Sequence, residues 1–196
     1  MKYTVLIFAA WFFVACETTT TPNAAVPAAS EGEKVNLSLY EVEEVDGSSL
    51  QLVLRRNNTG KIIEEGFVKN GVKTGTWVTY HEKDASAKTI ASYIDGVLNG
   101  IFLEMDRYGR LLSKTKYKNG VFHGEGAKYS FARTTESYNY KNGKLDGIYR
   151  RWYDNTGELQ MEAHYKDGEL HGKMTQYNKA GGVIIEYVYE NGVKVE

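Results

Sequence analysis

The sequence has few of the residues that cross-link or interrupt a fold. One cysteine, Cys16, and two prolines, Pro22 and Pro27, occur among its 196 residues. A single cysteine excludes an intrachain disulfide. Proline lacks the backbone N–H that a central strand donates, so the proline-free stretch after Pro27 is compatible with a continuous β-sheet.

Charge of either sign is not in excess, since 24 Lys and Arg stand against 25 Asp and Glu. A nucleic-acid-binding domain needs a basic patch or stripe, so nucleic acid is not an expected partner. The sequence also lacks the Gly-x-Ser-x-Gly, P-loop and His-Glu-x-x-His motifs of hydrolases, nucleotide-binding proteins and metalloproteases. We therefore expect no catalytic residue and no cofactor.

Glycine and tyrosine are abundant, with 20 Gly and 15 Tyr, and they recur with a period of about 24 residues from residue 44 onward. Each copy has an Asn-Gly or Asp-Gly pair and, in most copies, a second glycine four residues later. The first glycines are Gly71, Gly96, Gly120, Gly143, Gly168 and Gly192, and the second are Gly75, Gly100, Gly124, Gly147 and Gly172. Asn and Gly accept positive φ at low cost, so we assign both glycines to the turns of the repeat.

A second turn follows in most copies, for example at Asn57–Gly60 and Asn155–Gly157. The segments between turns are rich in Tyr, Val, Ile and Thr, as strands are. The pattern predicts an all-β fold, a repeat array of about six β-hairpins that forms an elongated, twisted antiparallel sheet. Residues 44–67 form a degenerate first copy, with Gln51 in place of the second glycine.

The histidines follow the same repeat. His123 and His171 occupy one position, immediately before the second glycine of two copies, and the intervening copy has Asp146 there. A zinc site normally needs more protein ligands than such a pair supplies. We interpret both histidines as solvated turn residues and expect no metal site.

Two rows of large side chains recur three residues apart. The first row contains Trp77, Phe102, Tyr149 and Met174, and the second contains Tyr80, Met105, Tyr129, Trp152 and Tyr177. Residues three apart in a regular strand face opposite sides, so either a bulge intervenes or both faces of the sheet carry apolar residues. Both rows can simply pack the sheet. Alternatively, one row is partly exposed and forms a binding surface, for which Trp77, Phe102, Tyr149, Tyr80, Tyr129, Trp152 and Tyr177 are the candidates.

The last apolar strand, Val183–Tyr189, is a second candidate surface. If the residues after it do not fold back to pair with it, its edge is open to a partner strand. If they do, the edge is covered.

The N-terminal residues have the pattern of a secretory leader. A basic residue, the apolar run Tyr3–Val14 and a small residue precede Cys16, and the run is too short to span a membrane. Residues 13–16 resemble the bacterial lipobox, which implies that Cys16 is lipidated. We therefore divide the chain into a lipoprotein signal peptide (1–15), a lipidated cysteine and flexible tether (16–34) and a β-repeat domain (35–196).

The repeat as a whole resembles the MORN repeat, and more narrowly a bacterial variant often labelled as an antitoxin-type repeat family. The resemblance rests on Tyr-x-Asn/Asp-Gly, the glycine four residues later and the aromatic residue two after that, as in Gly75 and Trp77. Gly126 and Met174 depart from the pattern, because they replace that aromatic residue. The resemblance implies a scaffold or a binder of proteins or membrane lipids.

These observations favour a non-enzymatic, lipid-anchored cell-envelope protein that scaffolds or binds a protein, glycan or lipid. Its expected partners are the membrane, through the anchor at Cys16, and an envelope protein. Because Glu17 rather than Asp follows Cys16, we expect the outer membrane. The alternatives are an envelope enzyme acting on glycan or peptide, which needs converging carboxylates, and the antitoxin of a toxin–antitoxin pair, which needs a cytoplasmic location.

Overall fold

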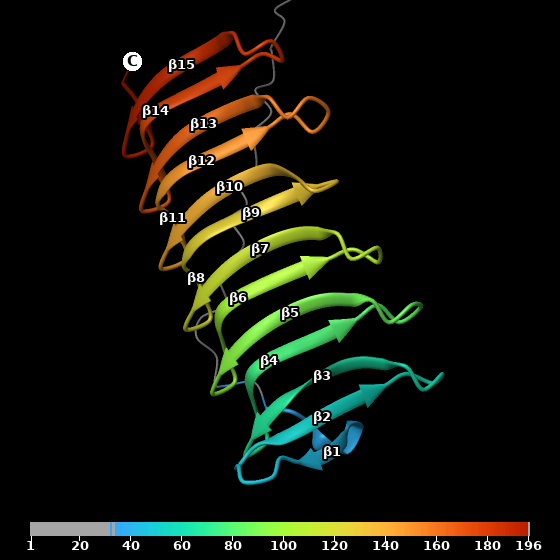
Figure 1. The fold of residues 1–196 in the computed structure, drawn as a ribbon. Coiled ribbons are helices and arrows are strands. Elements are labelled where there is room, and N and C mark those ends of the chain that lie inside the picture. The colour runs from blue at the N-terminus through green and yellow to red at the C-terminus, as the bar shows by residue number, and fades with distance from the viewer. Residues whose placement is uncertain (1–31, 33, 196) are drawn as a thin grey trace, which may run out of the picture.

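The structure is a computed structural model that describes residue 32 and residues 34–195. Its strands form one antiparallel sheet in which successive strands are neighbours, and the hairpins are stacked along an elongated, twisted array (Figure 1). The predicted all-β fold is confirmed. The leader, Cys16 and most of the tether lie outside the described residues.

The sheet is preceded by a short 3₁₀ helix, η1, Leu37–Leu39. The strands are β1 Glu41–Glu44, β2 Gln51–Arg56, β3 Ile62–Lys69, β4 Val72–Tyr80, β5 Ala87–Ile94, β6 Val97–Met105, β7 Leu111–Lys118, β8 Val121–Phe122, β9 Gly124–Ser130, β10 Arg133–Lys141, β11 Lys144–Leu145, β12 Gly147–Trp152, β13 Leu159–Lys166, β14 Glu169–Tyr177, β15 Val183–Glu190 and β16 Val193–Lys194. The short strands β8 and β11 pair with β7 and β10.

The Asn-Gly and Asp-Gly pairs form the predicted tight turns. At the six pairs from Asn70–Gly71 onward both residues have positive φ, for example 51° at Asn119 and 78° at Gly120, whereas at Asp46–Gly47 only the glycine does. Two successive positive φ angles are the mark of the type I′ turn, whose twist matches that of the strands on either side. Local sequence therefore fixes this end of the hairpins after the first copy.

The turns are also bonded to one another along the array. The amide of Gly96 donates to the carbonyl of Lys73 at 2.8 Å, and the amide of Gly120 donates to the carbonyl of Leu98 at 2.8 Å. The same bond recurs at Gly143, Gly168 and Gly192. Each copy thus supplies the acceptor for the next turn, which is the nearest-neighbour coupling expected of a repeat array.

The second glycines do not lie in turns, and that part of our assignment is wrong. Gly75 lies within β4 and Gly100 within β6, and both have positive φ, 64° and 114°. On β3, Phe67 pairs with Thr74 of β4, and the adjacent Gly66 pairs with Trp77 of β4. Strand β4 therefore has two extra residues at this point, and one of them is Gly75. The second glycine is therefore a bulge residue, whose conformation a side chain would strain.

In the degenerate first copy Gln51 occupies the position of the second glycine, as predicted. Gln51 pairs with Val68, as Gly75 pairs with Tyr93 in the next copy. The turn that precedes Gln51 is longer than in the other copies, because β1 ends at Glu44 and β2 begins at Gln51.

The two aromatic rows lie on opposite faces of the sheet. Strand β4 has no extra residue between Trp77 and Tyr80, so the residues alternate regularly from one to the other. We call the face that carries Trp77 and Tyr149 the first-row face, and the face that carries Tyr80 and Trp152 the second-row face. Both faces carry apolar side chains, which decides between the two alternatives left open by the sequence.

The core is on the first-row face, and it forms two clusters. One contains Val53, Val68 and Trp77, and residues of the 34–40 segment pack against it. The other contains Tyr138, Tyr140, Leu145 and Tyr149. A line of edge-on ring contacts, such as Trp77 with Tyr93 at 6.4 Å, runs along this face.

Neighbouring strands of the first-row face alternate large and small residues. Trp77 lies between Gly66 and Ala91, and a Cβ added to Gly66 would be 2.3 Å from the Trp77 ring. In the fourth copy the sizes are exchanged. Gly126 stands at the aromatic position, and the ring of its cross-strand partner Tyr138 covers it, with a Cβ at Gly126 only 2.2 Å from Cε2. This exchange explains the departure of Gly126 from the repeat pattern.

The two ends of the sheet differ in chemistry. At the N-terminal end the edge strand β1 contains three glutamates, which discourage association with another strand. At the other end β16 folds back and pairs with Tyr189 and Glu190, and the amide of Val195 bonds to Val188. Within the described residues no strand pairs with the outer edge of residues 183–187, so the edge is only partly covered.

Candidate functional site

The first row is part of the core. Trp77 is 2% exposed and Tyr149 is 3% exposed, and the half-buried Phe102 packs on Tyr117 with ring centroids 6.1 Å apart. Trp77 and Tyr149 are too enclosed to present a binding surface, and they are removed from the candidate surface. Phe102 is only half-buried, but it lies on the core face and packs against Tyr117.

The second row is partly exposed. Tyr80, Tyr129, Trp152 and Tyr177 are all half-buried. The Tyr80 hydroxyl donates to the carboxylate of Glu65, and burial together with this carboxylate raises the pKa of Tyr80 to about 12. Among residues 34–195 neither Tyr129 nor Trp152 has a side-chain hydrogen-bond partner, so each has a polar group available beside a partly accessible ring.

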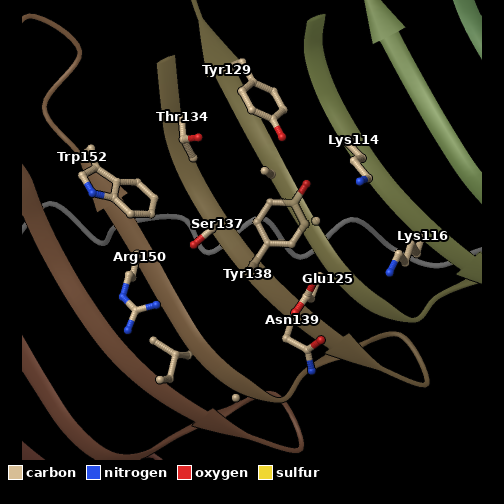
Figure 2. Close-up of a pocket in the computed structure, with 14 residues that line it drawn as sticks. Lys114, Lys116, Glu125, Tyr129, Thr134, Ser137, Tyr138, Asn139, Arg150 and Trp152 are labelled. Carbon is tan, nitrogen blue, oxygen red and sulfur yellow. The ribbon is translucent and has the colours of Figure 1, made fainter. Parts of the chain in front are cut away.

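Tyr129 and Trp152 line a groove of about 590 Å³ on the second-row face. It lies over β7, β9, β10 and β12, which belong to the end of the third copy, the fourth copy and the start of the fifth (Figure 2). Lys114 and Lys116 of β7 stand on one side, Arg150 and Trp152 of β12 on the other, with the central strands between them (Figure 2). The groove therefore brings together residues that are up to about forty positions apart in the sequence.

The groove forms because its floor has small side chains. Ala127 and Ser137 are cross-strand partners and both line the groove. The equivalent partners in an earlier copy are Val78 and Ile90, whose branched side chains fill the same space. Two adjacent small residues thus leave a hollow that the bulky pair does not.

The lining is rich in hydrogen-bond donors. Lys114 and Lys116 are half-buried and have no ion pair, and the hydroxyl of Ser137 and the indole N–H of Trp152 have no partner within the described chain. The Nε of Arg150 is engaged with Glu162 at 2.7 Å. Polar groups that are left without protein partners in a hollow are the usual attachment points of a ligand.

The groove is locally cationic although the chain is nearly neutral. Three lining residues carry positive charge, Lys114, Lys116 and Arg150, and one, Glu125, carries negative charge, so the lining sums to +2. The whole chain has a formal net charge of −1. The positive charge is therefore local to the groove, and it comes from the strands that flank the fourth copy, β7 and β12.

His123 and His171 are half-buried and do not lie in turns, so their interpretation as solvated turn residues is wrong: His123 lies between β8 and β9, and His171 lies within β14. The amide of Asn142 approaches Nδ1 of His123 at 3.4 Å, and the amide of Asn191 approaches Nδ1 of His171 at the same distance. Asp146, at the same position in the fifth copy, accepts from the amide of Asp167. This position thus links successive turns, and the described residues contain no group of three or more His, Cys, Asp or Glu that could hold a metal.

A charged network secures the 34–40 segment and is structural. Glu64 is 2.8 Å from Arg55 and 3.5 Å from Lys73, and it accepts from the Tyr40 hydroxyl at 2.9 Å. Burial raises the pKa of Tyr40 to about 12, with a further contribution from Glu64. Burial also acts to raise the pKa of Glu64, but Arg55, Tyr40 and Lys73 outweigh it and hold that pKa below its usual range.

Sequence reasoning found two groove residues, Tyr129 and Trp152, and missed Lys114, Lys116 and Arg150. The signal that would have helped is the run of small residues Gly126–Ala127, where other copies have two bulky residues.

Cys16 lies outside the described residues, so its lipidation stays a prediction. The part of the chain that the structure describes has no helix long and apolar enough to cross a membrane. No protein-family model matches this chain, and no curated protein is similar to it at a significant level.

Proposed function

We propose that this chain is a non-enzymatic cell-envelope protein, anchored by a lipid on Cys16, whose β-repeat domain binds another envelope component on its second-row face. The observation that carries the proposal is the groove, where Tyr129 and Trp152 adjoin unpaired cationic and hydroxyl groups. The leader, the tether and the resemblance to MORN repeats support the envelope location and a binding role. Two or more acyl chains would give the stable anchor that one chain does not.

The alternative of an envelope enzyme receives less support from the groove. Hydrolysis of a glycosidic bond usually needs two carboxyl groups about 5–9.5 Å apart. The groove lining contains one carboxylate, Glu125. The antitoxin alternative depends on location, because an anchored and exported chain does not meet a cytoplasmic toxin.

Two measurements test the proposal. Palmitate labelling should depend on Cys16 and be lost in Cys16→Ala, and labelling that persists in this variant would contradict lipidation there. Co-purification from detergent-solubilised envelopes should enrich a component with the wild-type chain and lose it with Trp152→Ala. Tyr177→Ala is the matched control, because Tyr177 belongs to the same row but does not line the groove. Equal enrichment by both variants would refute the assignment of binding to the groove.

A further inference from the structure

We infer that the groove binds an acidic carbohydrate, a sugar chain that carries carboxylate groups. This inference rests on the proposed binding function and names the class of its ligand. It depends on three properties of the groove: its charge, its balance of donors and acceptors, and its place on the sheet.

The first property is the pair of unpaired lysines. Lys114 and Lys116 are two residues apart on β7, so both side chains point to the second-row face, about 7 Å apart along the strand. Neither has an ion-pair partner in the described structure, although both are half-buried. Half-buried cations that are not engaged in an ion pair, in a groove whose lining sums to +2, favour an anionic ligand, and ammonium–carboxylate bonds are among the stronger hydrogen bonds.

The second property is the excess of donors. Ser137, Tyr129 and Trp152 each offer a donor that has no partner in the part of the chain that the structure describes. The amide nitrogen of Asn139 is already bonded to the Asp146 carbonyl at 2.6 Å, so the acceptors of the lining are the Asn139 carbonyl oxygen, the Glu125 carboxylate and the hydroxyl oxygens, which can also donate. A sugar acid presents many oxygen acceptors together with apolar C–H faces, and those faces can lie against the rings of Tyr129 and Trp152.

The third property argues against a peptide. The groove lies on the face of the sheet, where the backbone groups of β9 and β10 are used in the ladder between them. An extended peptide binds best at a sheet edge, where it completes that ladder. On this face the backbone N–H groups of a peptide would find few acceptors. A phosphate-dense polymer is also disfavoured, since the net charge of the chain is −1.

The test is binding of oligogalacturonate to the full chain in detergent micelles, measured by calorimetry and by the fluorescence of Trp152. The fully methyl-esterified oligomer is the matched neutral ligand, and a hexaglutamate peptide and phosphatidylglycerol vesicles represent other anionic classes. We expect oligogalacturonate to bind at least about tenfold more tightly than each of these. Equal binding of the ester, the peptide or the vesicles would overturn the inference, as would no detectable binding of the acid.

Variants locate the site. Lys114→Gln combined with Lys116→Gln should weaken binding at least about tenfold, and Trp152→Ala should weaken it and remove the fluorescence response. Lys166→Gln and Tyr177→Ala, which change residues outside the groove, should bind as the wild type does. Unchanged near-ultraviolet circular dichroism shows that a variant is folded. If the acid fails to bind but envelope co-purification still depends on Trp152, the ligand class is wrong and the proposed function stands; if neither occurs, both fail.

Discussion

The exchange of sizes between Gly126 and Tyr138 predicts that these two residues are energetically coupled. They are cross-strand partners on β9 and β10, in the position that Tyr149 and Ala163 occupy in the next copy. The double variant Gly126→Phe with Tyr138→Ala restores that arrangement, an aromatic ring opposite an alanine. We expect each single variant to be strongly destabilised and the double variant to be partly restored.

The structure gives the magnitudes. Tyr138 is 9% exposed, and truncation of a buried aromatic residue to alanine costs about 3–5 kcal/mol. In Gly126→Phe the new Cβ would lie 2.2 Å from the Tyr138 ring and 3.0 Å from the Lys114 carbonyl oxygen, and overpacking of this kind costs about 1–3 kcal/mol or more. In the double variant one ring replaces the other. Its loss of unfolding free energy should therefore be about 3 kcal/mol smaller than the summed losses of the two single variants. It stays less stable than the wild type, because the Thr115 hydroxyl loses its contact with the Tyr138 hydroxyl at 3.3 Å.

The assay is urea denaturation of the four proteins, with hydrogen exchange of the β9 and β10 amides as a local measure, since long repeat arrays can depart from two-state unfolding. Gly126→Phe combined with Met174→Ala is the control, because Met174 lies on the same face in another copy. Distant pairs add within about 0.5 kcal/mol. If the free-energy changes of Gly126→Phe and Tyr138→Ala add as closely as those of the control pair, the two residues are not coupled. The explanation of Gly126 by an exchange of side-chain sizes with Tyr138 is then refuted.

Three further predictions concern the ends and turns of the sheet. Glu64→Gln should lower stability at pH 7 by about 3 kcal/mol, the low end for a buried ion pair because Arg55 is 39% exposed. The pKa of Glu64 is lowered in the folded state, so the stability that its carboxylate contributes is complete above the unfolded pKa of about 4.3 and is lost as pH falls through the folded pKa. Melting temperatures between pH 6 and pH 2 should therefore change less in the variant than in the wild type. Parallel curves of melting temperature against pH would contradict this role of Glu64. Gly71→Ala should lower the free energy of unfolding, measured by urea denaturation, by about 1–2 kcal/mol, because φ is 73° at this residue while no atom would contact the new Cβ. Gly71→Asn should lower it by less, and an equal loss in the two variants would show that φ is not the cause. Ile184→Lys, at a 57% exposed position on the partly open edge, should reduce concentration-dependent association in analytical ultracentrifugation and leave the melting temperature nearly unchanged; association that is unaffected would show that this edge is not the contact.

The sequence was sufficient for the elements and their order because the repeat encodes them locally. An Asn-Gly pair specifies its own turn, and apolar segments of strand length between turns leave one arrangement, a meander. The position of Gln51 in the repeat also followed from the period alone, and its pairing with Val68 agrees with it. The role of the second glycines could not be predicted from the sequence, because glycine is suited equally to a turn and to a bulge. Only the cross-strand partners distinguish the two.

The exposed row and the groove required the structure for a related reason. Spacing within one strand could not tell which face is buried, since that depends on what covers each face, as the 34–40 segment covers Trp77. The groove depends on residues of four strands. Its cationic side comes from β7 and its aromatic residues from β9 and β12, so no single motif contains it.

The fourth copy is irregular in three ways, and all three lie around the groove. Its first-row face has the exchanged pair Gly126 and Tyr138, and its second-row face has the small floor. Its second turn is a tight pair, Phe131 and Ala132, which have positive φ of 48° and 65° without being glycine. Such strained residues persist where surrounding structure holds them, and they often occur at functional sites. The turn joins β9 and β10 directly beside Tyr129 and Thr134, which line the groove. A binding site in a repeat protein needs a place where the copies differ, and here the deviations in size, charge and turn geometry meet at one place, which favours the groove over any regular stretch of the aromatic row.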